Sequence, residues 1–325
     1  MAKSINVSLF DQVRAACARV AGRARHVHIR EERIPAYAAT LPLSEARCPA
    51  LDPATHYLGH GQGTLAFLVT LDAINFGSGY FPHLRKRPGL SGYFTVAASL
   101  NDRFRARGPL SAQDLAQLTT EDCTRLFGQD PANAPIAELM QLFATALQDL
   151  GRYLLDRFEG SFVRLVEAAH GSAEELVRLL AAMPFYDDRE AYDGLRVPFY
   201  KRAQLTAADL ALAFNGEGWG RFHDLDRLTI FADNLVPHVL RCDGILAYEE
   251  SLAARIDRGE LIPAGSPPEV EIRASAVHAV ELLVAALRGS GHDVSARGLD
   301  YLLWNRGQKP EYKARPRHRT RTVYY

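Results

Sequence analysis

An aspartate, Asp233, lies inside the apolar run LTIFADNLVPHVL of Leu228–Leu240. A carboxylate in such surroundings must be paired, coordinated or functional, because burying an isolated charge is costly. Pro237 is expected to interrupt the local hydrogen-bond ladder and to leave nearby backbone groups free. Two interpretations follow: Asp233 caps a helix that begins at Asn234, or it is a buried acid beside a pocket. The second is favoured, since perturbed acids gather at functional sites.

A glycine-rich turn, preceded by an acid, an amide and an aromatic residue, occupies Leu71–Pro82. Gly77 and Gly79 allow the backbone to approach a ligand closely. Aromatic rings here offer a surface on which a flat base can stack. The rings belong to Phe76, Tyr80 and Phe81. The alternative is a helix end or a hairpin turn whose aromatic residues pack in the core.

Two adjacent cations, Lys201 and Arg202, follow two aromatic residues in the segment PFYKRAQLT of Pro198–Thr206. Thr206 is expected to N-cap the helix that comes next. The free N–H groups and the dipole of a helix start would add to the two side-chain charges. The pattern indicates a phosphate site, and a solvated basic turn is the alternative.

The C-terminal segment, Arg306–Tyr325, is rich in lysine and arginine and ends in two tyrosines. It carries too little apolar surface to predict a helix of its own. One interpretation is a disordered basic tail. The other is an ordered tail whose aromatic residues dock and whose arginine or histidine side chains reach an anionic ligand.

The elements that position these residues are predicted to be mainly helices. Apolar residues at spacings of three and four over 135–158 predict an amphipathic helix with a wide buried stripe. Thr119 or Thr120 is expected to N-cap a short helix. The same apolar pattern predicts further helices over 161–183, 206–214, 229–256 and 274–288, the last ending at Gly289-Ser290-Gly291.

The first hundred residues are less regular. His26–Ile29 is predicted as a short strand, and Thr64–Thr70 fits either a strand or the start of a buried helix. No internal repeat or linker divides the chain. The fold class is therefore predicted to be mainly α, with a few short strands and one composite helical domain over residues 1–325 that includes an ordered basic tail over 306–325.

Composition excludes several classes of protein. The 325 residues carry 38 basic and 38 acidic side chains, so no net charge attracts the chain to a nucleic-acid polymer or an anionic membrane. The N-terminus lacks the apolar core of a signal peptide, and no apolar run approaches the ~18 residues of a membrane span. No HExxH, Walker or GxSxG motif is present. We expect a cytoplasmic protein with reduced thiols at Cys17, Cys48, Cys123 and Cys242.

Several segments, in their joint order, resemble the queuosine salvage protein family. They are DAINFGSGYFP within Leu71–Pro82, PFYDD at Pro184–Asp188, VPFYKRAQLTAADL at Val197–Leu210, LTIFADNLVPHVL at Leu228–Leu240, EVEIR at Glu269–Arg273, LDYLLW at Leu299–Trp304 and HRTRTVYY from His318. The resemblance implies a helical fold similar to helix-hairpin-helix DNA glycosylases. It also implies hydrolysis of the N-glycosidic bond of queuosine 5′-monophosphate, with no metal, no organic cofactor and water as the only co-substrate.

The resemblance also assigns roles to residues. Asp233 would stabilise the positive charge that develops on the ribose and would orient the attacking water. Asp72 and Asn75 would bind the ammonium and the diol of queuine. Phe76, with Phe199 or Tyr200, would stack on the base. Lys201, with His318, Arg319 or Tyr325, would bind the 5′-phosphate, and Asn234 would bind the substrate beside the acid. The expected partner is this small nucleotide, with no membrane and no stable nucleic-acid partner.

Two other functions stay open on the sequence alone. A helical glycosylase acting on DNA or RNA bases would need a basic face. A non-catalytic adaptor would bind RNA through the basic tail, and its binding would weaken steeply with salt.

Overall fold

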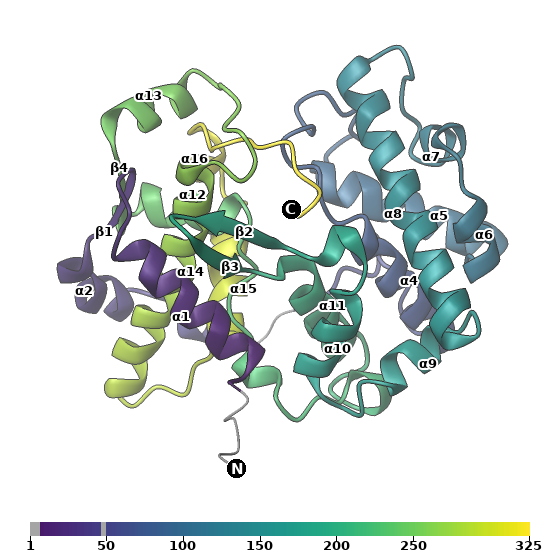
Figure 1. The fold of residues 1–325 in the computed structure, drawn as a ribbon, viewed down its shortest axis with the longest axis horizontal. Helices are drawn as coiled ribbons and strands as arrows, with labels where there is room; N and C mark the ends of the chain where they lie inside the picture. The colour runs from purple at the N-terminus through teal and green to yellow at the C-terminus, as the bar shows by residue number, and fades with distance from the viewer. Residues whose placement is uncertain (1–6, 47–49) are drawn as a thin grey trace. The chain divides into compact units, whose positions relative to one another are not determined.

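The computed structural model describes residues 7–46 and 50–325, which form two compact units. Unit 1 comprises the described part of residues 1–49 with 188–201 and 226–320, and unit 2 comprises 50–187, 202–225 and 321–325. Helices dominate both units, which confirms the mainly α prediction (Figure 1). The single domain and the likeness to helix-hairpin-helix glycosylases stay predictions.

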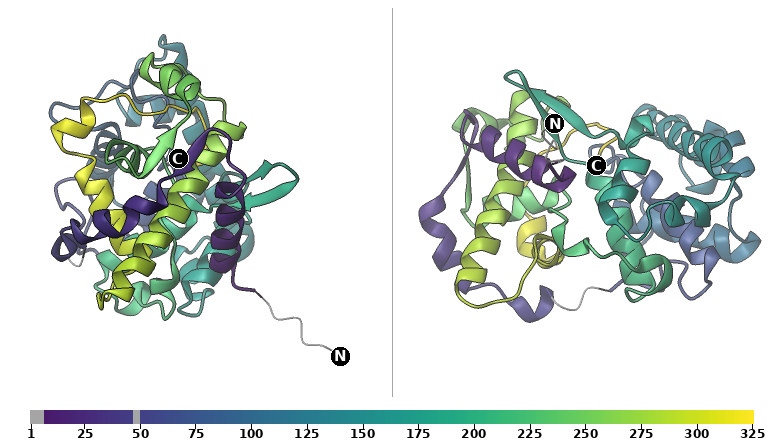
Figure 2. Two further views of the ribbon diagram at one scale, coloured as in Figure 1. Left: turned by 90° about the vertical axis from the view of Figure 1, so that its left-hand side faces the viewer. Right: turned by 60° about the horizontal axis from the view of Figure 1, so that its bottom comes forward.

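Unit 1 is built around a long helix, α14 (Pro267–Gly289), and the N-terminal helix α1 (Leu9–Ala21) lies along it in both views of Figure 2. The α1 side chains Phe10, Val13 and Cys17 are fully buried. The other elements of unit 1 are β1 (Val27–Ile29), η1 (Glu31–Arg33), α2 (Ile34–Ala39), α3 (Leu43–Ala46), β2 (Arg189–Tyr192), β3 (Leu195–Pro198), α12 (Leu235–Cys242), β4 (Leu246–Tyr248), α13 (Glu250–Asp257), α15 (Ala296–Arg306) and α16 (Pro310–Lys313).

Two small antiparallel sheets belong to unit 1. β1 pairs with β4, with Val27 opposite Tyr248, which confirms the strand predicted over 26–29. β2 and β3 form a hairpin whose turn residues Asp193 and Gly194 both have positive φ, 43° and 76°. An Asp-Gly pair favours this turn because its backbone twist matches that of the strands.

Unit 2 packs short helices on the 25-residue helix α8 (Ala134–Phe158), which confirms the stripe predicted over 135–158. Thr119 begins the neighbouring helix with a capping box, in which its hydroxyl and the Asp122 carboxylate each accept from the other residue's backbone N–H. The other elements are α4 (Gln62–Ala73), α5 (Gly92–Arg107), α6 (Ala112–Gln117), α7 (Thr120–Leu126), α9 (Phe162–Glu167), α10 (Ala173–Leu180), η2 (Pro184–Tyr186), α11 (Lys201–Ala213) and η3 (Gly218–Gly220). The first residue of α11, Lys201, is counted in unit 1. In η4 (Leu225–Arg227), Leu225 is the last residue of its segment in unit 2, and the other two residues belong to unit 1.

Several predicted boundaries were wrong. The helix predicted over 229–256 is replaced by α12, β4 and α13, and that over 161–183 is split into α9 and α10. α14 begins at Pro267, so the alternating run before residue 274 lies inside the helix. Thr206 caps nothing: α11 begins at Lys201, and the Thr206 hydroxyl donates to the carbonyl of Arg202.

The expectations for Pro237 and the tail are also corrected. Pro237 is the third residue of α12, in a first turn whose N–H groups have no partner within the helix, so it interrupts no ladder. The tail does contain a short helix, α16, and Arg319 forms a bridge with Leu261.

The remaining expectations concern the state of the cysteines and the presence of membrane-spanning helices. Cys17, Cys123 and Cys242 carry free thiols, and Cys48 lies outside the described residues. No helix formed by residues 7–46 and 50–325 combines the length and the apolar character that a bilayer crossing requires.

Candidate active site

Asp233 lies half-buried in unit 1, at the point where an irregular segment enters α12. Its Oδ1 accepts hydrogen bonds from the backbone N–H groups of Leu235 at 2.7 Å and Val236 at 3.3 Å. No described residue donates a hydrogen bond to Oδ2. The capping interpretation is therefore correct for one oxygen, although α12 begins at Leu235 rather than Asn234.

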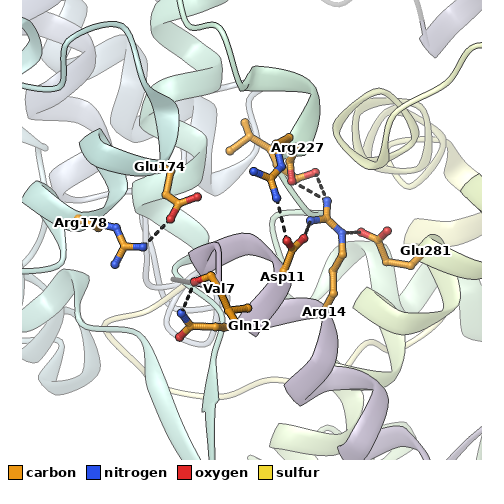
Figure 3. Close-up of polar contacts among 9 residues, drawn as sticks. Val7, Asp11, Gln12, Arg14, Glu174, Arg178, Arg227 and Glu281 are labelled. Carbon is orange, nitrogen blue, oxygen red and sulfur yellow. Dashed lines mark hydrogen bonds and ion pairs between the residues drawn. The ribbon is translucent and has the colours of Figure 1, made fainter. Parts of the chain in front are cut away.

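The start of this segment is tied to α1 by hydrogen bonds from Arg14 and by an ion pair between Arg227 and Asp11 at 2.8 Å (Figure 3). Arg14 contacts the carboxylates of Glu281 at 3.0 Å and Asp11 at 3.3 Å. It also donates to the carbonyl oxygens of Arg227 and Leu228. These contacts hold the chain in place a few residues before the acid. The pair of Glu174 and Arg178 in the same figure belongs to α10 of unit 2.

Asp300, on α15, is a second carboxyl near Asp233, and it was not among the predicted site residues. Its side chain is 3% exposed, and Oδ1 accepts from the backbone N–H of Phe231 at 2.9 Å. Burial, and next the charge of Asp233, raise the pKa of Asp300 well above its ordinary value. Both effects favour the neutral form of the Asp300 carboxyl. The signal was present in LDYLLW, an acid in an apolar run, which is the pattern that singled out Asp233.

The tail brings His318 beside the same segment. Asn234 Nδ2 donates to the carbonyl of His318 at 3.4 Å. Burial, and then the charge of Arg317, lower the pKa of His318 to about 3. The imidazole is thus neutral at neutral pH, and it would contact a phosphate through a hydrogen bond rather than a positive charge.

Arg317 and Arg319 have different surroundings in unit 1. Burial lowers the pKa of Arg317, and the nearby negative charge of Asp233 opposes that shift. The Arg319 carbonyl accepts from Ile262 N–H at 2.8 Å, and its guanidinium lies next to Gly259. Arg319 was among the predicted phosphate contacts and Arg317 was not, although the regular alternation of basic residues in the tail does not distinguish the two.

Lys201, Tyr200 and Phe199 precede and begin α11, and all three are buried. The Lys201 N–H donates to Asp188 Oδ2 at 3.0 Å. Tyr200 has a φ of +51°, an uncommon conformation for a residue with a side chain. One face of the Phe199 ring is covered by the guanidinium of Arg273, whose central carbon lies 4.0 Å from the ring centroid.

The remaining predicted residues belong to unit 2. Asp72 is fully buried in α4, and Arg202 donates to its carbonyl at 3.1 Å and to that of Ala73 at 2.7 Å. Asn75 follows the end of α4, and its N–H donates to the Asp72 carbonyl at 3.3 Å. Arg202 therefore fastens the end of the helix from which the predicted base-binding group emerges.

Phe76 and its neighbours are packed among aromatic rings. Phe76 is 2% exposed, meets Phe143 edge-on at 5.2 Å, and has the Arg202 guanidinium 5.0 Å from its centroid. Gly77, with a φ of +102°, donates its N–H to the carbonyl of Tyr325 at 3.0 Å. A Cβ at Gly77 would lie 2.7 Å from a methyl of Leu139. The absence of a side chain at Gly77 therefore lets its backbone lie close to Leu139.

The predicted site residues thus fall into two groups. Asp233, Asn234, Phe199, Tyr200, Lys201, His318 and Arg319 belong to unit 1, and Asp72, Asn75, Phe76 and Tyr325 belong to unit 2. Within unit 1 the contacts link Asn234 with His318. The first unit by itself contains a half-buried carboxylate at a helix start, near a buried carboxyl whose pKa is raised. These features define a mainly helical protein with an acid at its candidate site.

Comparisons with known proteins identify the family. The model of the family described as queuosine salvage protein matches residues 55–325. A Sphaerobacter thermophilus protein named queuosine 5′-phosphate N-glycosylase/hydrolase is 37% identical over 312 residues, 94% of this chain and 95% of that protein. Proteins with the same name from Mus musculus and Dictyostelium discoideum are 34% and 32% identical, covering 72% and 81% of this chain and 72% and 78% of their own lengths. The chain belongs to the queuosine salvage protein family.

Proposed function

We propose that this protein hydrolyses the N-glycosidic bond of queuosine 5′-monophosphate and releases queuine and ribose 5-phosphate. Membership of the family and the names of its relatives support the reaction. The observation that carries the proposal is the carboxylate of Asp233. One oxygen is fixed by α12, and the other accepts no hydrogen bond from the residues described.

The chemistry of the bond explains why such a group is needed. Cleavage of the C1′–N bond takes the bonding electrons to the base and leaves positive charge on the ribose. A carboxylate below C1′ stabilises that charge more in the transition state than in the substrate. Water then forms the new C1′–O bond and gives one proton to Asp233. That proton is passed on to the departing base, so one water balances the reaction and Asp233 returns to its ionised form.

The hydrogen bonds to Oδ1 favour this role for Oδ2. Two backbone donors hold the carboxylate in one orientation before substrate binds, so little reorganisation is required during the reaction. Burial raises the pKa of the nearby Asp300 carboxyl and so favours its neutral form, which limits repulsion of the Asp233 charge.

The binding residues are assigned by charge and shape. Lys201 would bind the 5′-phosphate, with His318, Arg319 or Tyr325 as further contacts. Phe199 or Tyr200 would stack on the base, and Asn234 would contact the ribose side. Asp72, Asn75 and Phe76 stay predicted ligands of the queuine base. We further propose a cytoplasmic location and no stable nucleic-acid partner, as the balanced charge of the chain suggests.

The experiment is a direct assay for the released base. Purified protein is incubated with queuosine, queuosine 5′-monophosphate or queuosine-containing tRNA, and free queuine is quantified by mass spectrometry. We expect queuine from the monophosphate at the highest rate. Absence of queuine from all three substrates would reject the proposed reaction, and release from tRNA alone would reject the proposed substrate.

A further inference from the structure

A buried ion pair in unit 1 lies outside the set of residues assigned above. Asp188 and Arg273 are 2% and 0% exposed. Arg273 Nη1 and Nη2 donate to Asp188 Oδ1 and Oδ2 at 2.9 and 2.7 Å, a two-pronged contact. The desolvation of two buried charges offsets much of their attraction, so stability alone is a weak reason for such a pair. Its other contacts indicate what it does.

Asp188 binds three consecutive residues of the chain. Its carbonyl accepts from the N–H groups of Phe199 at 2.9 Å and Tyr200 at 3.3 Å, and its Oδ2 accepts from Lys201 N–H at 3.0 Å. These bonds enclose Tyr200, whose positive φ costs on the order of 1–3 kcal/mol. Asp188 therefore fixes the backbone from which the Lys201 side chain extends.

Arg273 binds the other functional segment. Its Nε donates to the carbonyl of Ala232 at 2.9 Å, and Ala232 directly precedes Asp233. Its guanidinium also lies over the ring of Phe199. One arginine thus connects the backbone next to the acid with the aspartate that holds the backbone of the lysine.

We propose that the Asp188–Arg273 pair is a positioning pair that fixes the separation of Lys201 and Asp233, and so makes hydrolysis depend on a 5′-phosphate in the substrate. The inference rests on the proposed function. A phosphate held at Lys201 can align C1′ with Asp233 only if the two segments keep one spacing. A displacement of about 1 Å at a reacting centre can cost on the order of a hundredfold in rate.

The test compares two substrates on positioning variants. Arg273→Lys keeps the charge but cannot make the two-pronged contact and reach Ala232 together. Asp188→Asn keeps the shape but removes the charge and one acceptor. We expect the ratio of kcat/KM for queuosine 5′-monophosphate to kcat/KM for queuosine to fall at least about tenfold in both. A purely structural role would lower both values by a common factor and leave the ratio unchanged.

Arg306→Lys is the matched control. Arg306 also pairs with an aspartate, Asp243, at 3.4 Å and lies near the rings of Tyr37 and Tyr312 in unit 1. Its replacement is expected to lower the thermal midpoint while leaving the substrate ratio at the wild-type value.

Each outcome decides the inference. An unchanged ratio in whichever of the two positioning variants folds overturns it. If neither folds while Arg306→Lys does, the pair serves the fold, and the inference is equally overturned. Failure of the wild-type protein to cleave either substrate rejects the proposed function itself, and the wild-type assay separates that case from the others.

Discussion

The segments Leu228–Asn234 and Leu71–Pro82 each contain an aspartate and aromatic residues, yet the fold uses the two acids differently. Asp233 stands at the start of a helix, half-buried, with one oxygen held by backbone N–H groups. Asp72 lies within α4 and is fully buried, and the aromatic side chain that follows it packs against other rings. The place of an acid relative to a helix end decides whether backbone groups can hold it toward a ligand.

The largest expected effect concerns the aromatic segment and is on stability. Phe76→Ala should lower the free energy of unfolding by about 3–5 kcal/mol, because the buried ring leaves a cavity beside Phe143 and Arg202. Urea denaturation measures the loss. A change below about 1 kcal/mol would show that the ring contributes little to the core, and would erase the contrast between the segments.

The next effect concerns Asp233 and is on turnover. Asp233→Asn keeps an oxygen that can cap α12 but removes the charge, so kcat should fall about 10²–10³-fold with little change in thermal midpoint. Asp224→Asn is the matched control, since Asp224 caps α10 by accepting from Ala173 N–H at 2.6 Å and Glu174 N–H at 3.1 Å. That variant should lose about 1 kcal/mol of stability and no kcat. Equal kcat in the two variants would contradict the catalytic role of Asp233.

A smaller effect on catalysis is expected at Lys201, and it distinguishes this lysine from the adjacent Arg202. Lys201→Met should lower kcat/KM for the monophosphate about ten- to a hundredfold, the value of one charge-assisted contact, and leave queuosine cleavage nearly unchanged. Lys86→Met, at an exposed position, is the control and should change neither. Equal losses on both substrates would remove Lys201 from phosphate binding. Arg202, by contrast, is committed to carbonyl oxygens and to the rings of Phe76 and Tyr186.

The smallest effect on turnover is expected at Asp300. Because burial favours the neutral form of this carboxyl in the folded protein, and the amide has a similar shape, Asp300→Asn should change kcat less than about threefold. Its raised pKa means that the folded state binds more protons than the unfolded state from pH near 3.8 up to the folded pKa. Wild-type stability therefore falls across that window as pH rises.

The side chain introduced by Asp300→Asn does not titrate, so the stability of this variant relative to wild type should increase between pH 5 and pH 8. Thermal midpoints measured across that range test the sign. A constant difference between the two proteins would mean that Asp300 is ionised at pH 5 already.

A feature of the fold or of the candidate site could be predicted from the sequence where its signal comes from residues close together in the chain. The stripe of α8 and the capping role open to Thr119 follow from short spacings, and both are confirmed. Asp233 was found because its apolar neighbours are adjacent in sequence. The helix predicted over 229–256 failed because apolar spacing alone does not distinguish a helix from a buried irregular segment followed by a strand.

The residues missed are those whose importance depends on contacts distant in sequence. Arg273 meets Asp188 across 85 positions and Ala232 across 41, and no spacing rule connects them. Arg317 resembles every other basic residue of the tail until the fold brings it near Asp233. The burial that keeps His318 neutral could not be seen in the sequence.

Glu271 and Arg273, two of the buried charged side chains of α14, have partners that lie in different directions. Glu271 Oε2 accepts from three successive N–H groups at 3.0, 2.6 and 3.0 Å, at the start of β1, while Arg273 reaches Asp188 and Ala232. Residues two apart on a helix point about 200° apart, so the rotation of α14 about its axis is fixed from both sides. Loss of a single residue between them would turn the arginine by about 100° away from its partners. We therefore expect this part of α14 to tolerate substitutions far more readily than insertions or deletions, both in natural sequences and in laboratory recombination.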